Sequence, residues 1–237
     1  MAWTPITIQD QYLVGAQDAH SITAEQFRVL HARLEQLQKL QEYKILCVTS
    51  AVKGEGKTFT AVNLALTMAR DFSKRVVLMD VDCRKSVVLR LTGQDEHDNP
   101  GWSDVVSRKS ALKEILVSFG HEKLFLLPLG RSYSPSSNLI THLGTSELLK
   151  ELRSEFDYVV LDAPPILPVA DMRLLEDLVD GIIMVTRAEI TTTDVIKKAI
   201  NSLKKEKIIG FVLNDVKQMS KHYNYYVYQK HNNGNHV

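Results

Sequence analysis

A short segment, Ala51–Thr58, has the composition and spacing of a loop that binds phosphate. It reads AVKGEGKT and lies between an apolar run of strand length, 44–49, and a segment with apolar residues at helical spacing, 57–72. Glycines in such a loop let backbone N–H groups converge on phosphate oxygens, and the start of the following helix adds partial positive charge. Lys57 would then contact the outer phosphates, and the Thr58 hydroxyl would bind Mg²⁺.

Two acidic motifs follow other predicted strands. The first is Asp80-Val81-Asp82-Cys83-Arg84, and the second is Asp162-Ala163-Pro164-Pro165. Because the carboxyl ends of parallel strands meet at one edge of a sheet, where ligands bind, we expect both motifs beside the phosphate loop. Their carboxylates are the hard oxygen ligands that phosphate-bound Mg²⁺ uses, directly or through water.

The two motifs suit different roles. Asp162 would hold a magnesium-bound water. Asp80 and Asp82 lie two apart on an extended segment, so both would face the γ-phosphate, and one could accept a proton from an attacking hydroxyl. Arg84 and Lys85 either neutralise charge in the transition state or form a basic start to a helix.

The elements that must position these motifs alternate along the chain. Strands are expected at 44–49, 75–79, 124–127, 158–161, 182–186 and 208–213. Helices are expected at 24–41, opened by Thr23 and Gln26 at capping-box spacing, and at 57–72, 102–107, 111–117, 146–156, 171–178 and 192–204. Continuously apolar strands separated by helices indicate an α/β fold with a mostly parallel β-sheet covered by helices on both faces.

Composition narrows the class of protein. The 237 residues, 44% hydrophobic, fit one α/β domain or two small ones, and the net charge of +1 gives no bulk attraction to nucleic acid. No apolar run approaches the ~20 residues that a direct membrane span needs. The two cysteines, Cys47 and Cys83, do not suggest a disulfide framework, so a cytoplasmic protein with reduced thiols is expected.

Three regions are expected: an N-terminal arm at 1–22, a domain at 23–215 and a polar C-terminal tail at 216–237. The tail contains four of the eight tyrosines, Tyr223, Tyr225, Tyr226 and Tyr228. Its Asn and His residues argue against an edge strand, the other interpretation, and favour phospho-acceptors. Each phosphate would add about −1.5 to −2 charges, and their mutual repulsion offers a route to dissociating an oligomer.

The three motifs, in this order, resemble those of the bacterial tyrosine kinases of polysaccharide co-polymerase systems, the CpsD/CapB-like proteins. The likeness extends from Glu25 to Asn214 and includes the tyrosine-rich tail. It implies a P-loop NTPase-type fold of the MinD/ParA-like subclass. It also implies a cytoplasmic kinase, dependent on ATP and Mg²⁺, that phosphorylates its own tail tyrosines in trans within a ring-like oligomer and regulates exopolysaccharide or capsule assembly.

The resemblance also assigns residues and partners. Catalysis would fall on Lys57, Asp80, Asp82 and Arg84. ATP would be bound by Lys53, Gly54, Glu55, Gly56, Lys57, Thr58, Phe59 and Asn214, and the metal by Thr58, Asp82 and Asp162. The implied partners are a membrane polysaccharide co-polymerase, which activates the kinase and recruits it to the inner face of the membrane, and a cognate tyrosine phosphatase.

The sequence departs from this family in two places. The helix motif Glu-x-x-Arg-x-x-Arg, which mediates subunit contacts in the family, has His31 as its last residue, and a neutral histidine lacks the charged fork of arginine. Oligomerisation through this helix is therefore expected to be weaker or more sensitive to pH. Lys53 stands where the family often has proline.

Two other functions remain open. A ParA/MinD-like switch ATPase would transfer phosphate to water, but its signature lysine would fall at Val52, one position before Lys53. A degenerate family member would bind nucleotide only to scaffold its membrane partner. Asn214 is either a contact of the adenine base, as in related proteins, or a turn residue after a strand.

Overall fold

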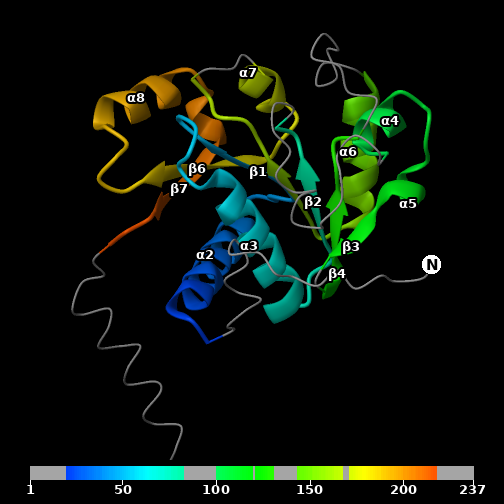
Figure 1. The fold of residues 1–237 in the computed structure, drawn as a ribbon, viewed down its shortest axis with the longest axis horizontal. Helices are drawn as coiled ribbons and strands as arrows, with labels where there is room; N and C mark the ends of the chain where they lie inside the picture. Colours follow the sequence, from blue (N-terminus) through cyan, green and yellow to red (C-terminus); the bar gives the residue numbers. More distant parts are fainter. Residues whose placement is uncertain (1–19, 83–99, 120, 131–142, 168–170, 218–237) are drawn as a thin grey trace, which may run out of the picture.

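The structure is a computed structural model that describes residues 20–82, 100–119, 121–130, 143–167 and 171–217. Its centre is a seven-stranded sheet with the order β3-β4-β2-β5-β1-β6-β7 (Figure 1). The strands are β1 Ile45–Ser50, β2 Val76–Asp80, β3 Val117–Phe119, β4 His121–Leu127, β5 Tyr158–Asp162, β6 Gly181–Arg187 and β7 Ile208–Asn214. Every described neighbour pair is parallel except β3 with β4.

Helices cover both faces of this sheet. They are α2 Ile22–Gln38, α3 Lys57–Asp71, α4 Trp102–Val106, α5 Leu112–Ile115, α6 Leu143–Glu155, α7 Asp171–Leu175 and α8 Thr193–Asn201. Apolar side chains of α2 and α3 form one buried cluster with Leu46 and Val48 of β1. The alternate β1 residues Ile45 and Cys47 belong to a second cluster, shared with α4 to α8 on the other face. The alternation of side chains along the strand thus divides the core into two layers.

The structure corrects the bounds of several expected elements. The helix expected at 24–41 ends at Gln38, the strand expected at 124–127 begins at His121, the helix expected at 146–156 begins at Leu143, and the helix expected at 171–178 ends at Leu175. The first described helix begins at Ile22, not after Thr23, because the Ser21 hydroxyl accepts the Ala24 N–H at 3.1 Å and caps the helix. The helix expected at 111–117 ends at Ile115. The last expected helix ends at Asn201 and is followed by a 3₁₀ turn, Lys205–Lys207.

Strand β3 is an element that the sequence did not predict. It follows α5 directly and pairs antiparallel with β4 at the edge of the sheet, with Val117 opposite Leu126. Three residues are too few for an alternating pattern to be recognised, and the helix expected at 111–117 overlaps this strand at Val117.

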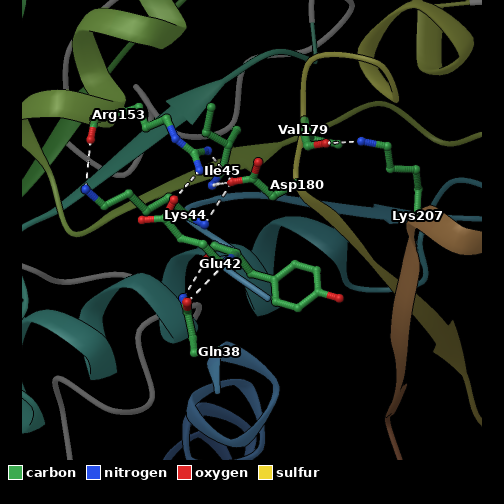
Figure 2. Close-up of polar contacts among 9 residues, drawn as sticks. Gln38, Glu42, Lys44, Ile45, Arg153, Val179, Asp180 and Lys207 are labelled. Atoms are coloured by element: carbon green, nitrogen blue, oxygen red, sulfur yellow. Dashed lines mark hydrogen bonds and ion pairs between the residues drawn. The ribbon is translucent and has the colours of Figure 1, made fainter. Parts of the chain in front are cut away.

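A cluster of polar side chains forms hydrogen bonds and ion pairs at the amino-terminal edge of the sheet (Figure 2). Asp180 Oδ2 accepts the backbone N–H groups of Lys44 at 2.8 Å and Ile45 at 2.7 Å, and the Arg153 guanidinium at 2.5 Å. Arg153 also binds Glu42 at 2.6 Å. The starts of β1 and β6 and the end of α6 are therefore joined at the edge opposite the phosphate loop.

Within the ranges that the structure describes, no helix is both long and apolar enough to cross a bilayer.

Candidate nucleotide and phosphotransfer site

The phosphate loop follows the buried strand β1 and opens directly into α3. Gly54 and Gly56 have φ angles of +90° and +97°, the left-handed region that favours glycine, and Gly56 caps α3. A Cβ atom on Gly56 would lie 1.9 Å from the Asn214 side-chain nitrogen. The second glycine of the loop is therefore required both by its backbone angle and by the close approach of β7.

Glu55 shapes the loop from within. It is 2% exposed, and its Oε2 accepts the Val52 N–H at 2.6 Å while Oε1 accepts the Thr191 hydroxyl proton. Its backbone carbonyl accepts the Asn214 side-chain amide at 3.0 Å. Since the carboxylate is used inside the protein, a contact between Glu55 and phosphate would come from its backbone N–H.

Lys57 lies between the two acidic motifs. Its Nζ is 2.5 Å from Asp82 Oδ2 and 3.9 Å from Asp162 Oδ1, and all three residues are buried. Burial alone would lower the pKa of Lys57, but the attraction of Asp162, Asp82 and Asp80 outweighs it and raises that pKa. The lysine is therefore charged at the place where phosphate oxygens would lie.

Strand register brings the acidic motifs together. Asp80, the last residue of β2, stands opposite Asp162 of β5, which in turn stands opposite Val48 of β1. The three strands that carry the motifs are thus adjacent, with β5 in the middle. The expected meeting of the motifs at one edge of the sheet is a direct result of this order.

The backbone of the first acidic motif is anchored on both sides. Asp80 Oδ1 accepts the Asp82 N–H at 3.1 Å, and the Asp80 carbonyl accepts the indole N–H of Trp102 at 2.7 Å. Trp102 is fully buried at the start of α4. Asp82 is thereby directed toward Lys57 by a fixed turn.

Asp162 has the chemistry of a metal-site carboxylate. It is 1% exposed, and burial raises its pKa to about 6, although the attraction of Lys57 opposes this shift. The Thr58 side chain hydrogen-bonds to it, while Oδ1 has no hydrogen-bond partner among the described residues. A buried carboxylate oxygen without a donor, beside a hydroxyl, suits a hard cation.

The donor set fits Mg²⁺ bound together with a nucleotide. Within the described ranges, no group of three or more His, Cys, Asp or Glu side chains could enclose a metal alone. Thr58 and Asp162, with Asp82 nearby, would supply protein oxygens, and phosphate and water would complete the set. Bound there, Mg²⁺ would neutralise charge that develops on the phosphates.

The remaining predicted site residues lie in different surroundings. Lys53 is exposed in the loop. The Phe59 ring packs against Phe27 of α2 with ring centroids 5.8 Å apart, so a nucleotide contact would come from its backbone. Asn214 contacts the loop itself. Arg84 and the tail tyrosines Tyr223, Tyr225, Tyr226 and Tyr228 lie outside the described residues.

Thr191 and Trp102 were missed in the sequence. Thr191 is 136 positions from Glu55, and Trp102 is 22 positions from Asp80, so no local spacing links either residue to its partner. The only available signal for Trp102 was a large aromatic residue just after Gly101 at the start of a predicted helix.

Helix α2 carries the motif that is expected to mediate subunit contacts, and in this structure its residues make contacts within the chain. Arg28 binds Glu25 at 2.7 Å and Asp71 of α3 at 3.2 Å. His31 is 1% exposed, with its ring centroid 3.9 Å from that of Phe72. The replacement of arginine by histidine thus places a ring in the core between α2 and the end of α3.

Comparisons with known proteins agree with this geometry. A model of the AAA domain family matches residues 43–215. The tyrosine-protein kinase YwqD of Bacillus subtilis (strain 168) is 31% identical over 218 residues, which cover 90% of this chain and 90% of the relative. The kinase domain of Escherichia coli tyrosine kinase ETK superposes with a TM-score of 0.81 at 24% identity, over 91% of this chain and 84% of that one.

The fold is shared more widely than the sequence. The septum site-determining protein MinD of Pyrococcus horikoshii OT3, complexed with Mg-ADP, gives a TM-score of 0.58 at 21% identity, over 78% of this chain and 76% of that one. This likeness confirms the expected P-loop fold class without separating kinases from switch ATPases. The match to YwqD, nearly a third identical over most of both chains, does separate them. The chain belongs to the bacterial tyrosine-protein kinase family and is built on an AAA-type P-loop domain.

Proposed function

We propose that this protein is an ATP- and Mg²⁺-dependent tyrosine autokinase whose acceptors are Tyr223, Tyr225, Tyr226 and Tyr228 of its own tail. The observation that carries the proposal is the buried contact of Lys57 with Asp82, 2.5 Å, beside Asp162. A phosphate-binding lysine and a carboxylate that can accept a proton then lie at one point. The tyrosine-protein kinase relative that matches 90% of this chain supports tyrosine, and not water, as the acceptor.

Each side chain has a defined part in the transfer. The loop N–H groups and Lys57 hold the β- and γ-phosphates of ATP. Asp82 accepts the proton of an acceptor tyrosine, whose oxygen then bonds to the γ-phosphorus. The bond between that phosphorus and the β,γ-bridging oxygen breaks, and ADP leaves with the electron pair. Asp80 holds the Asp82 backbone through its hydrogen bond at 3.1 Å and so fixes the distance to Lys57.

The proposal includes the assembly in which the protein acts. The domain at 23–215 would self-associate into a ring-like oligomer, so that the tail at 216–237 of one copy enters the site of a neighbour in trans. A membrane polysaccharide co-polymerase would recruit the protein to the inner face of the membrane and activate it, and a cognate tyrosine phosphatase would reverse the modification. Exopolysaccharide or capsule polymerisation and export would be the regulated process.

A switch ATPase is the second candidate. The fold that the chain shares with MinD is compatible with this function as well as with a kinase. In that case a water molecule would replace the tyrosine hydroxyl, and the same Asp82 would take its proton. The two functions therefore differ in the acceptor and not in the nucleotide site.

Identifying the group that accepts the γ-phosphate distinguishes the autokinase from the switch ATPase. Purified protein would be incubated with ATP and Mg²⁺, with and without a peptide from the cytoplasmic end of a candidate activator, and the phosphate mapped by mass spectrometry. We expect phosphotyrosine in the tail, none in Lys57→Met, and intact ATP binding but little phosphotyrosine in a chain that ends at Asp215. Released inorganic phosphate without phosphotyrosine would establish the switch ATPase. Nucleotide binding with neither product would establish the scaffold.

A further inference from the structure

Glu55 of the phosphate loop accepts hydrogen bonds from two residues that lie far from it in the sequence, Thr191 and Asn214. The Glu55 carboxylate accepts the Thr191 hydroxyl proton, and the Glu55 carbonyl accepts the Asn214 amide at 3.0 Å. Thr191 lies in the turn after β6, and Asn214 ends β7. Both contacts hold the loop in the shape that a phosphate would meet, and the roles described above do not use them.

The Thr191 hydroxyl makes one hydrogen bond to the phosphate loop and one within its own turn. It donates to Glu55 and accepts the Arg187 N–H at 3.2 Å. The Thr191 N–H in turn donates to the Arg187 carbonyl at 3.0 Å, which closes the turn. A side chain of the same shape without a hydroxyl would lose both side-chain hydrogen bonds and keep the packing.

Arg187 links this turn to Asp215, the residue that follows β7 at the start of the C-terminal segment. Its Nε and Nη2 each lie 2.8 Å from Asp215 Oδ2. The adjacent Ala188 N–H donates to the Asn214 carbonyl at 2.9 Å, so side chain and backbone both join the two strand ends. Asp215 has a φ angle of +57°, a strained conformation for a residue with a side chain, and these contacts stabilise it.

We propose that Thr191 is a positioning residue for the phosphate loop, and that the chain Glu55–Thr191–Arg187–Asp215 couples nucleotide affinity to the start of the C-terminal segment. A loop already ordered by Glu55 loses less conformational entropy when phosphate binds. Releasing Asp215 would loosen the turn that holds Thr191, and the loop would then be ordered only by the nucleotide. The importance of this coupling for tail phosphorylation rests on the proposed autokinase function.

The positioning role is tested by Thr191→Val against Thr191→Ser, with the affinity for Mg-ADP measured by calorimetry. Losing the hydroxyl is expected to weaken binding about 3- to 10-fold, and the serine variant should bind as the parent does. A kinetic assay should show a raised KM for ATP with little change in kcat, at a temperature well below the Tm that thermal unfolding without nucleotide gives for each variant. Equal affinity of the valine and parent proteins would overturn the proposal.

The coupling is tested by Asp215→Asn in the parent and in Thr191→Val. In the parent it should weaken Mg-ADP binding by about 2- to 3-fold, and in Thr191→Val it should have no further effect, because neighbours in one network are not additive. Asp177→Asn, which removes the exposed ion pair with Lys204 elsewhere on the surface, is the matched control and should leave affinity unchanged. Additive effects would refute the chain of contacts. Calorimetry requires no phosphotyrosine, so a failure here is distinct from a failure of the kinase assignment.

Discussion

Lys57 Nζ and Asp82 Oδ2 lie 2.5 Å apart in a site where both side chains are largely buried. The loop lysine is thus paired with the carboxylate that the proposed mechanism uses as a proton acceptor. In this state the two opposite charges attract each other, and this attraction offsets the free-energy cost of burying both groups. A nucleotide must compete with Asp82 for the lysine, and a tyrosine hydroxyl must compete with Lys57 for the aspartate.

This competition gives Asp82→Asn two opposite effects. The neutral amide holds Lys57 less strongly and keeps an oxygen that can bind Mg²⁺, so the affinity for Mg-ATP should stay equal to the parent's or rise. The amide cannot accept a proton, so the rate of phosphotyrosine formation should fall by about 100-fold or more. Titration with Mg-ATP and a single-turnover assay on the same protein measure the two effects.

Lys57→Met is the contrasting variant. It removes the contact with phosphate and should lose affinity and phosphotransfer together. If Asp82→Asn bound nucleotide as weakly as Lys57→Met does, Asp82 would be a binding residue and not the proton acceptor.

Trp102 offers a test of how the first acidic motif is positioned. Its indole N–H donates to the buried Asp80 carbonyl at 2.7 Å. Trp102→Phe keeps an aromatic ring but leaves that carbonyl without this donor, at a cost of about 1–3 kcal/mol in unfolding free energy. We expect kcat for phosphotransfer to fall severalfold while KM for ATP changes little, since Asp82 loses its fixed direction and the loop does not.

A stability loss alone would not produce that pattern. Phe156→Leu is the matched control, because Phe156 is a fully buried aromatic residue of the same core cluster at the end of α6. It should lower Tm and leave both kinetic constants unchanged well below the transition. Equal kinetics in Trp102→Phe and the parent would exclude the positioning role.

The sequence predicted the phosphate loop and the meeting of the acidic motifs because both depend on local signals. Glycine spacing, apolar runs of strand length and the carboxylate after each run are all contained in short windows. The parallel direction of β1, β2 and β5 then follows from the helices between the strands, whereas their order β2-β5-β1 was not predicted. The sequence also predicted buried strands correctly at β1 and β5, where every position is buried.

The contacts that complete the site could not be predicted from local sequence patterns. The hydroxyl of Thr191 reaches Glu55 across 136 positions, and nothing near Thr191 in the sequence marks it. The motif position of His31 predicted a residue at a subunit surface, yet the helix turns this side chain into the core. Side-chain direction depends on how α2 packs against α3, which is a tertiary property that spacing alone does not determine.

The amino-terminal edge of the sheet provides a prediction on stability alone (Figure 2). Asp180→Ala removes the acceptor of two backbone N–H groups and the ion pair with Arg153, so unfolding free energy should fall by about 2–3 kcal/mol. For a chain of this size that is a Tm decrease of about 4–12 °C. Asp180→Asn keeps an oxygen acceptor and should lose less.

Because this cluster lies opposite the phosphate loop, the affinity for Mg-ADP should not change in Asp180→Ala. Asp177→Ala, which removes an exposed ion pair three residues earlier, should leave Tm as in the parent. An affinity loss in Asp180→Ala well below its Tm would show that the two edges of the sheet are coupled.

His31 makes the packing of α2 sensitive to acid. Its ring lies on Phe72 and edge-on to Tyr158, with Glu35 at 3.4 Å, and Glu35 pairs with Lys74 at 3.2 Å. Burial lowers the pKa of His31, an effect that the attraction of Glu35 opposes and the repulsion of Lys74 increases. The folded chain therefore binds this proton less readily than the unfolded chain does.

The sign of the pH effect follows from that difference. Above the ordinary histidine pKa of about 6.5 both states are neutral at this position, and as the pH falls below it the unfolded state gains a proton first, so stability is lost. Urea unfolding at pH 7.5 and 5.5 should show a larger loss in the parent than in His31→Leu, which cannot titrate. His20→Gln, at an exposed histidine just before α2, should retain the parent's loss. The same loss in the parent and in His31→Leu would mean that other groups, and not His31, make the fold sensitive to acid.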